Sequence, residues 1–160
     1  APDVPADMRH RLAVAAASIE PVMTVSRVEI DRPGPSYMVD TLRELRLRHA
    51  GAELVLILGA DQLAALGSWH EPEQIPRLAR IAVAPRPGVE LAGLDEAQVE
   101  QVRMPLIGIS STMVRDRVAH GLPIHHLVPA PVRAVIEAEG LYRPAPTPVE
   151  TGGDASRHPW

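Results

Sequence analysis

The chain has 160 residues, 46% of them hydrophobic, and a formal net charge of −4 at pH 7. This length and composition suit one domain with an apolar core, and the mildly acidic balance argues against a general nucleic-acid or membrane-surface binder. The absence of Cys excludes disulfides and thiolate metal sites, and the absence of Lys leaves Arg as the side chain for clamping phosphate. No apolar run is long enough for a membrane span and no signal-peptide core begins the sequence, so we expect a cytoplasmic protein.

The first quarter of the chain predicts a helix, a strand and a second helix. Asp7 can cap a helix that runs to about Ser18 and is ended by Pro21. Residues 22–30 (VMTVSRVEI) are rich in β-branched residues and roughly alternating, which predicts a strand. After a rigid Pro- and Gly-containing loop, Ser36 is predicted to cap a helix.

The middle of the chain predicts buried strands separated by short helices. Residues 53–58 (ELVLIL) and 80–84 (RIAVA) are nearly continuous apolar runs, as in strands of a parallel sheet that are covered on both faces. Between them we expect a short helix to about Leu66 and another from near Glu71. A short helix over 94–101 and a short strand or extended segment over 102–107 are predicted to follow.

Two helices and a polar tail are predicted at the C-terminal end. The first helix runs from Ser110 to about Ala119, and the second from Pro129 to Glu139, each stopped by a glycine. Residues 144–160 are rich in Pro, Gly and small polar residues, which predicts a disordered tail after a domain of residues 1–143.

Alternation of strands and helices predicts an α/β fold with a doubly wound parallel sheet. In such folds ligands bind beyond the carboxyl ends of the strands. The loops to consider are therefore 31–37, 59–70, 85–88 and 108–115.

Hydroxyl groups and an arginine gather at the predicted helix start near residue 110. Ser110, Ser111 and Thr112, with Arg115 one turn on, could bind an anion through side chains and free amides. The alternative is an ordinary helix cap beside a surface arginine, and taken alone it is the favoured interpretation.

Two further segments carry polar or aromatic groups after predicted strands. Gly59 would let a ligand approach the backbone and Asp61 could accept hydrogen bonds, although a simple helix cap is the favoured alternative. Trp69 could stack on a flat ring or equally be a partly buried core residue. Tyr37 and Met38 lie at another helix N-terminus, which suits an acidic ligand, with a capped helix as the alternative.

The seven histidines form no recognised metal-binding pattern. His125 and His126 are adjacent, so on a helix they would point in different directions. We therefore expect no protein metal site.

Five segments, in this order, resemble the bacterial nicotinate-nucleotide adenylyltransferases over about residues 7–143. They are VSRVE through PSYMVDTL at 25–42, LGAD with the later SW at 58–69, VAPRPG at 83–88, ISST with Arg115, and LVP through GLY at 127–142. The resemblance implies a Rossmann-like nucleotidyltransferase domain that transfers AMP from ATP to nicotinate mononucleotide, giving deamido-NAD and pyrophosphate with Mg²⁺ present.

The same resemblance implies roles for individual residues. Those placed along ATP are Gly59, Asp61, Ser110, Ser111, Thr112 and Arg115. Those bordering the nicotinate ring and its carboxylate are Tyr37, Met38, Trp69 and His70.

The sequence departs from the family in three places. His70 stands where an aromatic residue is common in the family, although it could still stack on the ligand. Met38 stands where the family usually has Thr, which removes a hydroxyl near the pyridine carboxylate. The G-x-F-D-P-x-H-x-G-H loop, which supplies the family's catalytic histidines, has no counterpart in these residues, so we expect the domain to be N-terminally incomplete. We therefore expect this chain by itself to be poorly stable and weakly active, with strand 53–58 exposing an edge or a face.

Other functions stay open at this point. One is a non-catalytic remnant that binds nucleotide without pyrophosphate release. Another is a sister adenylyltransferase for a different phosphorylated substrate, against which the Tyr37 and Trp69 segments argue. Homo-oligomer formation is also left open.

Overall fold

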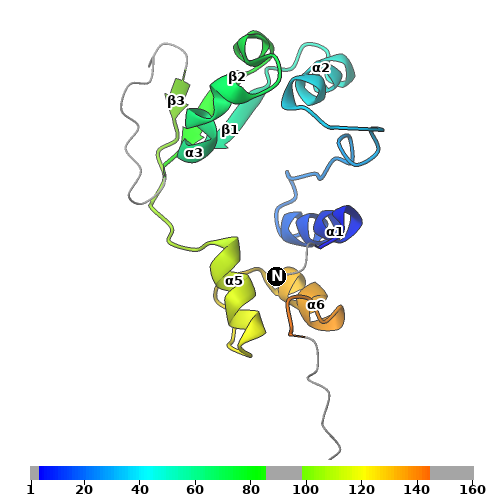
Figure 1. Ribbon diagram of the computed structural model, residues 1–160, viewed down its shortest axis with the longest axis vertical. Helices are drawn as coiled ribbons and strands as arrows, with labels where there is room; N and C mark the ends of the chain where they lie inside the picture. Colours follow the sequence, from blue (N-terminus) through cyan, green and yellow to red (C-terminus); the bar gives the residue numbers. More distant parts are fainter. Residues whose placement is uncertain (1–3, 86–98, 145–160) are drawn as a thin grey trace, which may run out of the picture.

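The computed structural model describes residues 4–85 and 99–144. Figure 1 shows two packed groups of elements, joined by an irregular segment with turns before α2 and by a second segment after β3. One group holds the sheet with the short helices around it, and the other holds α1, α5 and α6. None of the helices in the described residues is both long and apolar enough to cross a membrane.

The elements follow one another in the order helix, helix, strand, short helices, strand, strand, helix, helix. Their bounds are α1 (Ala6–Ala17), α2 (Met38–Arg48), β1 (Val55–Gly59), α3 (Ala60–Ala64), η1 (Leu66–Ser68), η2 (Pro72–Gln74), α4 (Ile75–Leu78), β2 (Arg80–Ala84), β3 (Val99–Gln101), α5 (Ser111–Ala119) and α6 (Ala130–Ala138).

The sheet has three parallel strands in the order β1-β2-β3. Leu56 pairs with Ile81, and Ile81 pairs with Val99, so these three side chains share one face. The connection from β1 to β2 contains helices, as parallel pairing requires. The predicted α/β fold with a parallel sheet is therefore confirmed.

One face of this sheet forms the main core. Leu58, Ile81 and Val83 are buried there against residues of the surrounding helices. Val39 of α2 and Ile75 of α4 are fully buried in the same cluster. Each such side chain contributes about 1.5–3 kcal/mol relative to an exposed one, so this cluster fixes α2 against the sheet layer.

The second core lies among α1, α5 and α6. Val114, Ile124 and Ile136 are its buried residues, and Leu12 of α1 packs against them. The predicted helices are confirmed here, with their stops: Gly121 lies at φ 67° directly after α5, where a residue with a Cβ would be strained.

The opposite face of β1 is largely uncovered. Val55 is 49% exposed and Ile57 is 66% exposed, and β1 also forms one edge of the sheet. The register places Arg80 on this same face, where it forms ion pairs with Glu53 and Glu100. The predicted burial of 53–58 on both faces is therefore wrong, and the predicted exposure of a face is confirmed.

Segment 22–30 is not a strand in the structure, contrary to the sequence prediction. Its residues form turns and irregular backbone, with Val22 89% exposed and Met23 58% exposed. Propensity alone does not make a strand, because the backbone needs a neighbouring strand to complete its hydrogen bonds.

The other corrections concern element ends. Residues 99–101, predicted as the end of a helix, are strand β3, while 86–98 lie outside the described residues. Residues 102–107 form no further strand: the Val102 amide donates to the Val83 carbonyl at 2.9 Å, and the chain then leaves the sheet. Nearly all of the predicted tail, 145–160, also lies outside the described residues.

Candidate functional site

Tyr37 and His70 are stacked on each other although 33 positions separate them in the sequence. Their ring centroids are 4.2 Å apart and their planes differ by 28°. Tyr37 is the residue immediately before α2, with extended backbone (φ −101°, ψ 145°), and His70 lies in the loop between η1 and η2. Both side chains are exposed, so the pair presents a flat aromatic surface beside the start of α2.

An ion pair between Arg43 and Glu71 holds this loop against α2. The Arg43 guanidinium donates to both Glu71 carboxylate oxygens, at 3.2 and 2.6 Å, and also to Asp40 at 3.3 Å. The hydrogen bond from Arg43 lowers the pKa of Glu71, so this carboxylate stays ionised. Glu71 has a left-handed backbone (φ 48°), and the fork geometry of Arg43 fixes where the preceding His70 ring lies.

Trp69 and Met38 contribute mainly to the core. Both are partly buried and pack against the cluster that contains Val39 and Leu58. Trp69 therefore fits the core interpretation, although it adjoins His70 in the chain. Met38 is the first residue of α2 and lies next to Tyr37.

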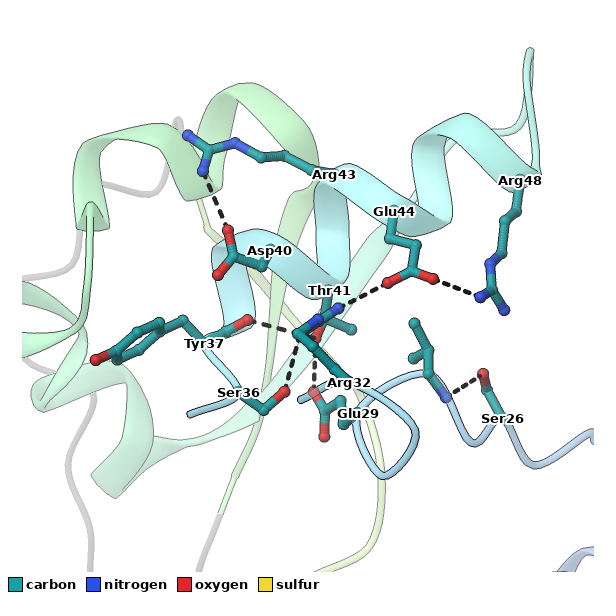
Figure 2. A network of polar contacts seen from close by, with 11 residues as sticks. Ser26, Glu29, Arg32, Ser36, Tyr37, Asp40, Thr41, Arg43, Glu44 and Arg48 are labelled. Atoms are coloured by element: carbon teal, nitrogen blue, oxygen red, sulfur yellow. Dashed lines mark hydrogen bonds and ion pairs between the residues drawn. The ribbon is translucent and has the colours of Figure 1, made fainter. Parts of the chain in front are cut away.

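A partly buried polar network behind Tyr37 was not predicted from the sequence. Arg32 donates to the Ser36 hydroxyl at 2.8 Å, to the Thr41 hydroxyl at 3.1 Å and to a Glu44 carboxylate oxygen at 2.9 Å (Figure 2). The Thr41 hydroxyl in turn donates to Glu29 at 2.9 Å. The only sequence signal was the Pro- and Gly-containing loop itself, which indicates rigidity but not which side chains fasten it.

Ser36 does not cap α2, contrary to the sequence prediction. The N-cap position is Tyr37, and within the described part of the chain no side chain caps this helix through a hydrogen bond. The Ser36 hydroxyl is occupied by Arg32 instead. Asp7 likewise lies inside α1, whose N-cap is Pro5.

Gly59 and Asp61 lie at the carboxyl end of β1. Gly59 ends the strand and is the N-cap of α3, with extended backbone (φ −74°, ψ 157°). Asp61 lies in the first turn of α3. This is the position at which α/β sheets place ligands.

The start of α5 is a capped helix N-terminus beside a cavity. The Ser110 hydroxyl accepts a hydrogen bond from the Met113 amide at 3.1 Å, as the ordinary cap interpretation predicted. Arg115 donates to the Thr112 hydroxyl at 3.1 Å. A cavity of about 300 Å³ adjoins this turn, lined by Ser110, Ser111, Arg115 and apolar residues of α1, α5 and α6.

Comparison with known proteins assigns this chain to a family. The family model described as cytidylyltransferase-like matches residues 2–117. A protein of Leifsonia xyli subsp. xyli named "Probable nicotinate-nucleotide adenylyltransferase" is 43% identical over 141 residues, which cover 87% of this chain and 70% of that protein. The chain belongs to the nicotinate-nucleotide adenylyltransferase family.

Other members give the same result. Proteins with the same name from Thermus thermophilus and Streptomyces coelicolor are 42% and 44% identical over 89% and 86% of this chain, and over 76% and 74% of their own lengths. The solved structure of Plasmodium falciparum nicotinic acid mononucleotide adenylyltransferase complexed with NaAD superposes with a TM-score of 0.66 at 16% identity, covering 89% of this chain and 76% of that one. This likeness confirms the nucleotidyltransferase fold.

Of the site residues that the family resemblance implies, the structure brings some together and separates others. Tyr37 and His70 are in contact, with Met38 and Trp69 beside them. The nucleotide-side residues are divided: Gly59 and Asp61 belong to the sheet group, whereas α5 packs in the helical group. Among the described elements, no extensive packing joins α5 to α3 or to the strands. The joint ATP site therefore stays a prediction.

Proposed function

We propose that this chain provides the substrate-binding part of an enzyme that transfers AMP from ATP to nicotinate mononucleotide, yielding deamido-NAD and pyrophosphate. The observation that carries the proposal is the Tyr37–His70 stack beside a helix start that no described side chain caps. Relatives more than 40% identical are named as probable nicotinate-nucleotide adenylyltransferases, which supports it.

The reaction makes and breaks one phosphorus–oxygen bond. A phosphate oxygen of nicotinate mononucleotide bonds to the α-phosphorus of ATP, and the bond from that phosphorus to the α,β-bridging oxygen breaks, so pyrophosphate leaves. Such a transfer depends mainly on alignment and on stabilising charge, and needs no protein nucleophile. The described residues would therefore act chiefly by binding and orienting the two nucleotides.

The pyridine end would lie at the N-terminus of α2. A carboxylate is stabilised there by the backbone amides of the first turn and by the positive end of the helix dipole. Because Met38 has no hydroxyl, those amides would have to bind the carboxylate without it. The pyridine ring would lie against the Tyr37–His70 pair and not between the two rings, since their centroids are only 4.2 Å apart and a third ring between them would need about twice that separation.

The ATP end would use the carboxyl end of β1 and the start of α5. Gly59 and Asp61 are at the first location, and Ser110, Ser111, Thr112 and Arg115 at the second. Arg115 supplies the positive charge that a triphosphate requires, in a chain without Lys. Binding one ATP with both locations would require them to approach each other.

Mg²⁺ fits this proposal as part of the ATP substrate and not as a protein-held ion. In the ranges 4–85 and 99–144 there is no group of three His, Asp or Glu side chains that could hold a metal. The triphosphate would supply ligands to the ion, because Mg²⁺ in nucleotide sites binds largely to substrate phosphates and water. A cytoplasmic location and self-association stay predictions.

A pyrophosphate-release assay on the complete chain with ATP and Mg²⁺ tests the proposal. Release that depends on nicotinate mononucleotide, and is weaker with nicotinamide mononucleotide or pantetheine phosphate, is expected. ATP binding without release under any substrate would indicate a binding remnant. Faster release with either alternative substrate would indicate a sister enzyme and contradict the proposed substrate.

A further inference from the structure

Arg32 connects the loop before α2 to two successive turns of the helix itself. Its side chain is only 16% exposed, although it lies in a loop. It donates to Ser36 on the loop, to Thr41 in the first turns of α2 and to Glu44 one turn later. One guanidinium thus joins three positions that surround Tyr37 on the chain (Figure 2).

The Thr41 hydroxyl is the group of this network that is best protected from water. Thr41 is 6% exposed, and its hydroxyl accepts from Arg32 and donates to Glu29. Glu44 keeps its negative charge because the hydrogen bond from Arg32 lowers its pKa, with Arg48 as a second partner. Hydrogen bonds in which one partner is charged are stronger than those between two neutral groups, so they can hold this loop in one conformation.

The network has a direct consequence for the start of α2. A serine at the N-cap position usually turns its hydroxyl toward the first-turn amides, but the N-cap of α2 is Tyr37 and Ser36 precedes it. Here the Ser36 hydroxyl faces Arg32, and the helix start is left to Tyr37, whose side chain cannot cap it. The ring of Tyr37 points away from the network, toward the side where His70 lies (Figure 2).

We propose that Arg32 is a positioning residue for the pyridine nucleotide: it holds Ser36 off the helix start and so keeps the α2 amides and the Tyr37 ring in place for the ligand. This inference rests on the proposed function for its ligand, but the geometry it describes exists without one. Arg32 does not touch the ligand and acts through Ser36 and Tyr37.

A lysine could not replace Arg32 in this role. Its ammonium is a single point of charge, whereas the guanidinium reaches Ser36 and Glu44 in different directions from separate nitrogens. Arg32→Lys therefore keeps the positive charge but loses the simultaneous hydrogen bonds to Ser36 and Glu44. Arg32→Met removes both.

Arg48→Met is the matched control. Arg48 also forms an ion pair with Glu44, but 54% of its side chain is accessible, compared with 16% for Arg32. The control removes one positively charged partner of Glu44, as Arg32→Met does, while leaving Arg32, Ser36 and Thr41 unchanged.

The first test is calorimetric titration of the complete chain with nicotinate mononucleotide and, separately, with a non-hydrolysable ATP analogue. Arg32→Met and Arg32→Lys are expected to raise the Kd of the mononucleotide by about tenfold or more, which corresponds to the loss of one strong contact. The Kd of the ATP analogue is expected to change by about twofold or less. Arg48→Met is expected to change neither. Equal weakening of both ligands by Arg32→Met, with Arg32→Lys like wild type, would show a general stability effect and overturn the proposal.

The second test needs no ligand. The ring protons of His70 are shifted by the stacked Tyr37 ring, and their NMR signals can be assigned with a His70→Gln variant. In Arg32→Met these signals are expected to move toward the values of an unstacked histidine, while Arg48→Met leaves them in place. If they stay in place in Arg32→Met, the positioning role is excluded. If the wild type fails to bind nicotinate mononucleotide, the proposed function fails, and the role of Arg32 is still decided by these signals.

Discussion

Arg43 and Glu71 form a two-point ion pair between α2 and the loop that carries His70. The two nitrogens of Arg43 lie 3.2 and 2.6 Å from the two carboxylate oxygens of Glu71, 28 positions later in the chain. The pair lies next to the Tyr37–His70 stack, so its expected effect is on the position of the histidine ring more than on overall stability.

Removing either member of this pair is expected to weaken binding of nicotinate mononucleotide. Arg43→Met and Glu71→Gln should each raise its Kd several-fold, because the His70 loop loses its attachment to α2. The double variant should lose no more than the worse single variant, since both remove one interaction. Calorimetric titration of the four proteins measures this. Additive losses in the double variant would mean that the residues act separately.

The acidic groups of these ion pairs predict a pH-dependent stability. Arg43 lowers the pKa of Glu71 and Arg32 lowers that of Glu44, both from an ordinary value of 4.5. Because the folded-state pKa lies below the unfolded one, the stabilisation is fully present above pH 4.5 and is lost as the pH falls through the folded-state value.

The double variant Glu44→Gln/Glu71→Gln isolates this contribution. Its melting temperature should lie below that of the wild type at pH 7, and the difference should disappear as the pH falls well below 4.5. Thermal unfolding followed by circular dichroism at several pH values measures it. A difference that grows on acidification would contradict the assigned direction of the pKa shifts.

Two isoleucines allow the buried core to be compared with the uncovered face of the sheet. Ile75 is fully buried, whereas Ile57 is 66% exposed. Ile75→Ala should lower the free energy of unfolding by about 2–5 kcal/mol, as large-to-small changes in cores do. Ile57→Ala should change it by about 0.5 kcal/mol or less. Urea unfolding measures both, and equal losses would mean that the β1 face is covered in solution.

The cap of α5 gives a similar comparison between adjacent serines. The Ser110 hydroxyl accepts from the Met113 amide, whereas Ser111 is the first residue of the helix and makes no such cap. Ser110→Ala should cost about 1 kcal/mol of stability, and Ser111→Ala much less. Urea unfolding of the two variants checks this. The reverse order would show that the cap observed here does not form in solution.

The sequence predicted best those elements whose signal is local. The apolar runs predicted as strands at 53–58 and 80–84 correspond to the paired parallel strands Val55–Gly59 and Arg80–Ala84, and the helices after Ser110 and Pro129 begin and end near the predicted residues. Continuous hydrophobicity and helix-end residues are properties of neighbouring positions, so they can be read without knowing the tertiary fold.

Features that depend on distant partners were not predictable in this way. Segment 22–30 has strand propensity but gains no neighbouring strand, and Ser36 has cap chemistry but is bound by Arg32. Tyr37 and His70 were assigned to one site only through the family resemblance, because no local sequence pattern indicates a contact between positions so far apart.

The most direct test of the account is the preference of the wild-type chain between two pyridine mononucleotides that differ only at the ring substituent. Calorimetric titration compares nicotinate mononucleotide, which carries a carboxylate, with nicotinamide mononucleotide, which carries a neutral amide. The account predicts at least about tenfold tighter binding of nicotinate mononucleotide, because the start of α2 favours a negative charge and lacks a side-chain cap. Equal binding of the two, or tighter binding of the amide, would contradict the claim that α2 and the Tyr37–His70 pair form a nicotinate site.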